Sequence, residues 1–304
     1  MKILITGATG FLGRRVCEVL SQAGHTLIAL SRDPHRAKQR VPSLQEAFAW
    51  NSLKELPPSR ALEGCDAVIH LAGESVAGRW TDTKKASIRD SRVLGTRNLI
   101  ETIAKLEARP KVLISASAIG YYGDRGEETL TEESAPGSDF LAQVCRDWEG
   151  EAARAENLGI RVVRVRIGLV LGPQGGALQA LLPIFQVGLG GPLGSGRQFW
   201  SWVHRDDVVG AIQFALERED LRGPINVTAP QPVRQREFAQ ILGRVLRRPV
   251  VLPTPAFALK IVLGEFSSEL LSSKRVLPQR LSQAGYRFRF AELEPALHEI
   301  LKAR

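Results

Sequence analysis

Three glycines near the start of the chain have the spacing expected of a phosphate-binding turn. The segment KILITGATGFLG places Gly7, Gly10 and Gly13 after an apolar run and before an amphipathic segment, in the pattern G-x-x-G-x-x-G. The first glycine permits a tight turn, the second lets a pyrophosphate approach the backbone, and the third lets a helix pack closely on the strand. A turn can also be rich in glycine for steric reasons alone. The residues expected to contact the anion are Gly7, Thr9, Gly10, Phe11, Leu12 and Gly13.

The second apolar run ends in a pair of residues suited to a further phosphate. It reads IALSRDP, with Ser31 and Arg32 at the position where a site selective for NAD carries an acidic residue that binds the ribose hydroxyls. A hydroxyl and a planar guanidinium instead suit a 2′-phosphate dianion. We therefore predict NADP as the cofactor. The alternative is that Arg32 is a solvated arginine at a strand end. The acidic neighbour Asp33 counts against a phosphate site here.

These residues must be positioned by a sheet, and the chain alternates short apolar runs with longer segments of helical period. Such alternation indicates right-handed crossovers and a parallel sheet that is covered on both faces. We predict an α/β fold with a doubly wound parallel (Rossmann) sheet, in which residues 1–168 bind the cofactor and the core extends to about residue 228. The expected strands are 2–6, 26–31, 66–73, 111–117 and 160–168, and the expected helices are 11–23, 83–107 and 139–157.

The second half of the chain, residues 169–304, has a different texture. After Gly168 the chain is crowded with Gly, Pro and aromatic residues and has little regular period, and we interpret this stretch as loops of a substrate cleft. From Val208 onward helical patterns return, with one or two short strands. Residues 253–304 are expected to form a smaller, mostly helical C-terminal domain that caps the cleft.

Composition narrows the possible partners. Apolar runs are too short to span a bilayer, and the three cysteines, Cys17, Cys65 and Cys145, lack the spacing of a disulfide framework or a zinc site. The net charge of +9 is spread along the chain among acidic residues, which favours a solvated surface over a nucleic-acid site. We expect a cytoplasmic monomer or homodimer with a small-molecule substrate, no metal, no membrane partner and no nucleic-acid partner.

Several segments in this order resemble a known superfamily. With TGATGFLG, LSRDP, AVIHLAGE, SASAIGYYGD and RIGLVLGP, the chain resembles the extended short-chain dehydrogenases/reductases, and it is similar to the atypical branch of NAD-dependent epimerase/dehydratase-like proteins with an added C-terminal helical domain. The resemblance implies that Leu71, Ala72 and Gly73 lie beneath the adenosine and ribose, that Arg92 contacts the cofactor from above, and that Val170 lies beside the nicotinamide. Each could instead have a packing or surface role.

The acid/base pair that this resemblance leads one to expect is missing. Members of the superfamily usually pair a tyrosine with a lysine four residues later, and the lysine helps the phenol to exchange a proton. In the segment SDFLAQVCRDWEGEA these positions are Phe140 and Val144, neither of which can exchange a proton. No shift of one or two residues restores the pair.

Other polar side chains near the expected strand ends are the remaining candidates. Ser117 fits the position of the superfamily's catalytic Ser/Thr, and Tyr121 and Tyr122 follow it, where they could orient a carbonyl or a sugar hydroxyl. Packing under the cleft is the alternative for both tyrosines. Glu74, just after the expected strand 66–73, is a candidate replacement base or an exposed loop acid.

A final group precedes a predicted helix in WVHRDDVVGAIQFAL. His204 is a candidate polar group of the substrate cleft or a structural histidine, and Asp207 is expected to cap the helix. Trp202 and the nearby Trp200 could stack on a sugar or a base, although tryptophan more often packs in a core.

Two functions from different classes compete at this point. The first is an NADP-dependent oxidoreductase or epimerase acting on a small carbonyl or sugar-nucleotide-like substrate, in which the cofactor carries most of the chemistry. The second is a cofactor-binding regulatory protein without turnover, because relatives are sometimes described as cell-division inhibitors and because Phe140 and Val144 replace the usual pair. A fold alone does not certify a reaction.

Overall fold

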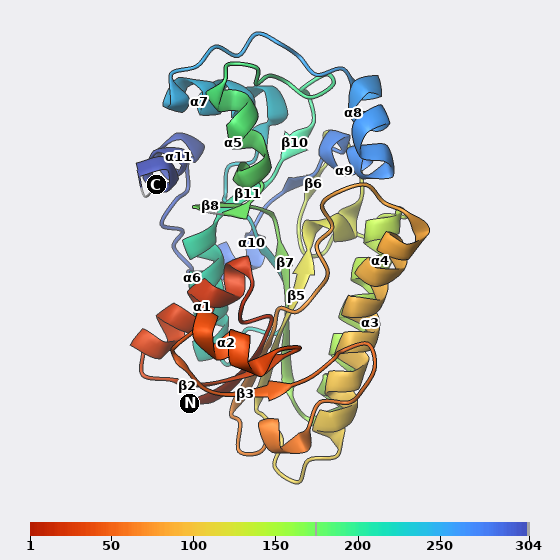
Figure 1. The fold of residues 1–304 in the computed structure, drawn as a ribbon, viewed down its shortest axis with the longest axis vertical. Helices are drawn as coiled ribbons and strands as arrows, with labels where there is room; N and C mark the ends of the chain where they lie inside the picture. Colours follow the sequence, from red (N-terminus) through yellow and green to blue (C-terminus); the bar gives the residue numbers. More distant parts are fainter. Residues whose placement is uncertain (174, 303–304) are drawn as a thin grey trace.

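The computed structural model describes residues 1–173 and 175–302, and its central feature is a seven-stranded parallel sheet (Figure 1). The strand order is β3-β2-β1-β4-β5-β7-β12, and every neighbouring pair is parallel. This order confirms the predicted doubly wound fold. The strands are β1 (Lys2–Thr6), β2 (Thr26–Ser31), β3 (Leu44–Ala49), β4 (Ala67–His70), β5 (Val112–Ala118), β7 (Arg161–Ile167) and β12 (Gly223–Val227).

Helices cover both faces of this sheet (Figure 1). Successive side chains of a strand point to opposite faces, so Ile3 and Ile5 of β1 pack in one apolar cluster with α1 and α6, whereas Leu4 packs in a second cluster with α3 and α4. The sheet is thus buried on both sides, as parallel sheets generally are. The helices of these layers are α1 (Phe11–Gln22), α2 (Pro34–Arg40), α3 (Asp82–Ala104), α4 (Phe140–Ala153) and α6 (Arg205–Glu217), with short 3-10 turns η1 (Ser59–Ala61), η2 (Ile119–Tyr122) and η3 (Arg154–Leu158).

The two edge strands of the sheet, β3 and β12, are not among the five strands that the sequence predicted. The edge strand β3 has the sequence LQEAFA, in which only Leu44 is buried, so it lacks the continuous apolar run that marks the inner strands. The other edge strand, β12, lies far along the chain and completes the sheet beside β7. Long-range pairing, not local pattern, places both.

The segment after Gly168 is more regular than predicted. It contains α5 (Leu178–Gln186), whose buried residues Leu178, Leu182 and Phe185 follow helical spacing even though Pro183 lies inside the helix. The frequent glycines and prolines obscured this period. The segment also forms the short strands β8 (Leu169–Gly172), β9 (Gly175–Gly176), β10 (Phe199–Trp200) and β11 (Trp202–His204).

The C-terminal region is mostly helical, as expected, and it is tied to the main sheet domain. Its strand β14 (Arg275–Val276) pairs in parallel with β6 (Thr129–Leu130), which follows η2. None of the helices in the described part of the chain is both long and apolar enough to cross a bilayer. The remaining elements are β13 (Val233–Arg234), α7 (Gln235–Leu246), α8 (Ala256–Leu263), η4 (Gly264–Phe266), α9 (Ser267–Leu271), α10 (Gln279–Gln283) and α11 (Leu293–Lys302).

Candidate functional site

The carboxyl ends of four neighbouring strands bring most of the predicted site residues to one edge of the sheet. The glycine turn follows β1, Arg32 follows β2, residues 71–74 follow β4, and Ser117 lies in β5 just before η2. The chain reverses its direction of winding between β1 and β4, which is the position where open α/β sheets bind ligands.

The glycine turn has a geometry that only glycine tolerates. Gly7 has φ of 72°, and a Cβ on Gly13 would lie 2.1 Å from the carbonyl oxygen of Gly7. Gly10 occupies the N-cap of α1 and offers no side chain to the amides of the first helical turn. Those amides are therefore available to an anion, and the turn fits a pyrophosphate.

The hairpin that contains Val170 packs on the same turn. A Cβ on Gly175 would lie 2.3 Å from the ring of Phe11, and added Cβ atoms on Gly172 and Gly176 would lie 2.9 and 3.0 Å from it. Glycines are needed so that β8 and β9 can approach this ring. The structure thereby brings Val170 close to the start of α1, while Thr9 and Leu12 are half-buried around the turn.

Arg32 is positioned as a free cation at the end of β2. It is exposed, and it forms no ion pair with any residue in the described ranges. Asp33 does not neutralise it, because one carboxylate oxygen of Asp33 accepts a hydrogen bond of 2.9 Å from the amide of Arg36 and so caps α2. Ser31 exchanges hydrogen bonds with the backbone of Asp33 at 3.1 and 3.2 Å.

A directed chain of hydrogen bonds holds the segment after β4. The Thr96 hydroxyl donates to the carbonyl of Arg92, so it must accept from Nε2 of His70, and Nδ1 of His70 then accepts from the Thr6 hydroxyl at 2.7 Å. Thr6 in turn accepts from the amide of Ala72 at 3.1 Å. Burial lowers the pKa of His70 to about 4, so His70 is neutral in this chain at neutral pH.

The guanidinium of Arg92 contacts the backbone of the segment after β4. It donates to the carbonyl of Glu74 at 2.9 Å and lies over the ring of Trp148 at 5.2 Å. A Cβ on Gly73 would lie 3.2 Å from its central carbon, so the close approach favours glycine there. Its contacts in the protein are thus to Glu74, Ile88 and Trp148.

The Glu74 side chain is a weaker base than its position suggested. Its carboxylate accepts a hydrogen bond of 2.6 Å from Nζ of Lys84, and this bond lowers the pKa of Glu74. Both side chains remain partly exposed. A carboxylate with a lowered pKa holds a proton poorly, so Glu74 is suited to fixing a cation or hydroxyl.

Ser117 is part of a buried ion-pair network. Its hydroxyl donates to Oε1 of Glu149 at 2.7 Å, and the same carboxylate receives two hydrogen bonds of 2.8 Å from Arg166. All three side chains are almost fully buried. The proton of Ser117 is therefore committed to Glu149, and only the lone pairs of its oxygen can still accept a hydrogen bond.

The two tyrosines of η2 have opposite environments. Tyr122 is fully buried, donates to Asn226 at 2.7 Å and accepts from Arg166 at 3.0 Å, and burial raises its pKa to about 12. Tyr121 is half-buried, its ring lies 3.5 Å from the guanidinium carbon of Arg166, and its hydroxyl has no hydrogen bond to the residues described by the structure. Of the three predicted hydroxyls, that of Tyr121 is the available one.

Apolar packing surrounds the two positions at which the resemblance led us to expect a tyrosine and a lysine. The Phe140 ring lies 5.2 Å from that of Trp80, in a tilted edge-on arrangement, and Val144 is buried in the same cluster. Lys85 places its ammonium 4.9 Å from the Phe140 ring. This cluster leaves no proton-exchanging group at either position.

Two residues predicted to line a substrate cleft are structural instead. Trp202 is fully buried in a core cluster and donates to the carbonyl of Gln231, so it cannot stack on a ligand. His204 is 1% exposed; its Nδ1 accepts from the amide of Asp206 and caps α6, and its Nε2 lies 3.1 Å from Glu299. The prediction that Asp207 caps α6 is also wrong.

Asp207 serves a long-range purpose that the local pattern did not reveal. Its two carboxylate oxygens accept hydrogen bonds of 2.7 and 3.0 Å from the amides of Arg289 and Phe290, which precede α11. It therefore ties the start of α6 to the C-terminal region.

Sequence reasoning missed Glu149 and Arg166, the pair that organises this edge of the sheet. One signal was present, because Arg166 interrupts an apolar run in RVVRVRI, and a charged side chain in an inner strand needs a buried partner. The sequence did not identify Glu149 as that partner, since the two belong to different elements, β7 and α4.

Comparison with known proteins agrees with this arrangement. Residues 3–228 match the model of the NAD dependent epimerase/dehydratase family, and residues 254–300 match a domain of unknown function, DUF1731. The epimerase family protein SDR39U1 homolog, chloroplastic, of Arabidopsis thaliana is 42% identical over 99% of this chain and 87% of its own length. The epimerase family protein YfhF of Bacillus subtilis is 39% identical over 100% and 99%.

A solved structure extends the comparison to three dimensions. The crystal structure of human epimerase family protein SDR39U1 (isoform 2) with NADPH is similar with a TM-score of 0.89 at 33% sequence identity, and the match covers 99% of both chains. The similarity therefore includes both the sheet domain and the C-terminal helices. On these grounds the chain belongs to the NAD dependent epimerase/dehydratase family.

Proposed function

We propose that this chain binds NADP(H) at the glycine turn and uses it in hydride transfer to or from a small carbonyl or sugar-nucleotide-like substrate. One arrangement carries the cofactor assignment: the amides of α1 begin without a side-chain cap, and Arg32, which has no ion pair with the described residues, follows the next strand while Asp33 caps α2. The human relative crystallised with NADPH supports the same assignment.

The proposed division of labour follows the edge of the sheet. The turn from Gly7 to Gly13 would hold the pyrophosphate, and Ser31 with Arg32 would hold the 2′-phosphate. Leu71, Ala72 and Gly73 would lie along the adenosine and ribose, with Arg92 holding their segment in place. When bound, the cofactor supplies or accepts the hydride, and the protein supplies orientation and electrostatics.

Within this proposal Tyr121 is the group that would exchange a proton with the substrate. It is the only one of the three predicted hydroxyls that is both partly exposed and without a hydrogen bond to the described residues. Ser117, whose proton is held by Glu149, would accept a hydrogen bond from a substrate hydroxyl. The catalytic pair of the superfamily is thus replaced by one tyrosine beside a buried arginine.

The cofactor assignment is tested by removing the cation at the end of β2. Arg32→Ala should weaken NADPH binding about 30-fold, equivalent to about 2 kcal/mol for a lost charge-assisted bond, and should leave NADH binding nearly unchanged. Isothermal calorimetry with both cofactors measures this difference. Equal losses for NADPH and NADH would refute the phosphate role of Arg32.

A matched control separates a local phosphate contact from a general effect of charge. Arg222 is an exposed arginine next to Gly223, at the start of the opposite edge strand β12. Arg222→Ala removes the same charge and should change the NADPH affinity by less than about twofold, because exposed charges that far apart are screened by salt.

A second candidate function is a cofactor-binding regulator without turnover. It is favoured by the apolar packing at Phe140 and Val144 and by the committed protons of Ser117 and Tyr122. Mixing the wild-type chain and NADPH with a broad panel of carbonyl compounds and sugar nucleotides, while following nicotinamide absorbance, separates the two. Turnover supports the enzyme, whereas tight NADPH binding without turnover on the panel supports the regulator.

A further inference from the structure

One end of the molecule exposes an unusual number of large apolar side chains. Five of them are between 68% and 70% exposed: Val187, Val251, Phe257, Ile261 and Val262. Ile184, Leu189 and Leu252 of the same segments are about half exposed. Single exposed apolar residues are ordinary on a protein surface, but a group of this size is typical of a surface that contacts another protein, a membrane or a ligand.

These residues form one surface because their segments are joined by hydrogen bonds. The amide of Gly194 donates to the carbonyl of Thr254 at 2.8 Å, and the amide of Thr254 donates to Pro192 at 2.8 Å, so the segment after α5 runs beside the segment before α8. Helix α8 begins directly afterward at Ala256. Figure 1 shows α5, the connection from α7 and α8 together at the end of the molecule opposite the N-terminus.

Helix α8 is almost uniformly apolar, and most of it faces outward. Its sequence is AFALKIVL, in which only Leu259 is buried, while Phe257 and Ile261 are exposed one helical turn apart. The single charged residue of the helix is Lys260, which is exposed. Eight residues span about 12 Å, so α8 is too short to cross a bilayer but long enough to lie in its interface.

The surroundings of this surface are basic. Residues 238–264 contain Arg244, Arg247, Arg248 and Lys260 and no acidic residue. Arg244 pairs with Glu294, but Arg247, Arg248 and Lys260 form no ion pair with residues in the described part of the chain. The nearest acid after α8, Glu265, is held by Lys85 at 3.0 Å.

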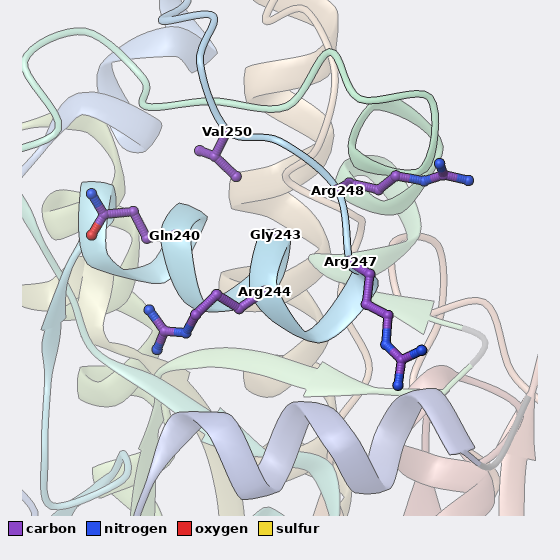
Figure 2. Close-up of a pocket in the computed structure, with 6 residues that line it drawn as sticks. All are labelled: Gln240, Gly243, Arg244, Arg247, Arg248 and Val250. Carbon is purple, nitrogen blue, oxygen red and sulfur yellow. The ribbon is translucent and has the colours of Figure 1, made fainter.

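The arginines surround a hollow without converging on it. A surface hollow of about 360 Å³ at the end of α7 is lined by Gln240, Gly243, Arg244, Arg247, Arg248 and Val250. In Figure 2 the side chains of Arg244, Arg247 and Arg248 point in different directions, away from one another. Side chains that diverge in this way can contact several anionic groups spread over a surface, but they cannot together enclose one small anion.

We propose that this end of the molecule, the surface formed by Val187, Leu189, Arg247, Arg248, Val251, Leu252 and α8, binds peripherally to an anionic lipid bilayer. The apolar side chains would enter the interface, and the basic side chains would contact lipid phosphates. A second copy of the chain fits less well, because a two-fold contact places the same patch against itself and so gathers Arg247, Arg248 and Lys260 of both copies in one interface, where their positive charges repel. The sequence alone predicted no membrane partner, since it does not show which apolar residues are exposed.

The proposal is tested with the full chain and two kinds of vesicle. Flotation at 50 mM salt should retain the protein on phosphatidylcholine vesicles that contain 30% phosphatidylglycerol and should retain much less on phosphatidylcholine alone. Raising the salt to 0.5 M should release most of it, because the attraction to surface charge is screened. Failure of the wild-type chain to bind the anionic vesicles at low salt would overturn the proposal.

Variants identify the surface that binds. The double variant Phe257→Ser/Ile261→Ser should weaken vesicle binding at least tenfold, and Arg247→Gln/Arg248→Gln should weaken it about 25-fold on anionic vesicles only. Leu53→Ser/Leu56→Ser changes two exposed apolar residues outside this surface and should have no effect. Equal vesicle binding by all variants would show that this surface is not the one that binds. A wild-type dimer in light scattering that Phe257→Ser/Ile261→Ser dissociates would also contradict the proposal, because the surface would then bind a second copy of the chain. NADPH affinity should be unchanged throughout, so this test is independent of the proposed cofactor function.

Discussion

At the scale of single residues, the three candidate hydroxyls at the carboxyl end of β5 differ in whether the hydroxyl already donates its proton to a protein group. Ser117 donates to Glu149, and Tyr122 donates to Asn226, so neither can protonate a substrate without breaking a buried hydrogen bond. A hydrogen-bonded proton inside a protein is costly to remove, because its partner is left unsatisfied. Tyr121 has no such commitment to the described residues and is partly exposed.

The two adjacent tyrosines should therefore respond differently to loss of the hydroxyl. Tyr122→Phe should lower the free energy of unfolding by about 1–3 kcal/mol, because Asn226 and Arg166 lose a buried partner. Tyr121→Phe should change it by less than about 0.5 kcal/mol, yet should reduce any NADPH-dependent turnover by about 100-fold or more. Urea denaturation and nicotinamide absorbance measure the two effects, and the reverse pattern would contradict the assignment of Tyr121.

At the scale of elements, the start of α1 depends on how closely the helix approaches β1. Gly13 lies in the first turn of α1, and its Cα faces the carbonyl of Gly7 with no room for a methyl group. The aromatic ring of Phe11 is in turn enclosed by the glycines of the β8–β9 hairpin. The glycine turn is thus fixed from two sides, by β1 and by the hairpin that carries Val170.

Gly13→Ala should displace this turn. A methyl group 2.1 Å from a carbonyl oxygen forces the backbone to move, so we expect a loss of about 1–3 kcal/mol in the free energy of unfolding and at least a tenfold loss of NADPH affinity. Gly150→Ala is the matched control, because Gly150 lies within α4 and nothing is within 4 Å of an added Cβ. That control should stabilise the chain by about 0.5–1 kcal/mol and keep its NADPH affinity. Similar losses in both variants would contradict the steric argument.

At the scale of the whole molecule, buried neutral histidines connect distant elements. His70 joins β4 to β1 and α3, and His204 joins the start of α6 to α11. Burial lowers the pKa of both side chains below that of an unfolded histidine. The unfolded chain therefore binds protons more readily, so the stability that depends on these groups is complete above about pH 6.5 and is lost as the pH falls.

His70 makes the more specific prediction, since its folded pKa is about 4. Between pH 7 and pH 5 its protonation in the unfolded chain should lower the free energy of unfolding by about 2 kcal/mol. In His70→Asn this pH-dependent difference should shrink by about that amount, whatever the overall cost of the substitution. Urea denaturation at both pH values measures it, with the exposed His35→Asn as a control. An undiminished difference in His70→Asn would show that His70 is not the group responsible.

Local pattern was enough to predict the inner strands of the sheet and the glycine turn. The glycine spacing follows directly on β1, and the Ser31–Arg32 pair lies at the end of the next strand, so each part of this candidate site could be found within one short segment. The inner strands could be predicted because burial on both faces requires continuous apolar runs. Edge strand β3 is half-exposed and lacked that signal.

The tertiary structure alone decided which side chains are buried and which are paired. Ser117, Glu149 and Arg166 come from β5, α4 and β7, and only the packing of these elements shows that the serine proton is already taken. Trp202 and His204 are residue types that often line a ligand cleft, but here they are enclosed by the core and α11. Phe257 and Ile261 are residue types that usually lie in a core, but here they face outward. The physical reason is that residue type determines only how strongly a side chain prefers to be buried. The arrangement of elements that are distant in sequence determines whether it is buried.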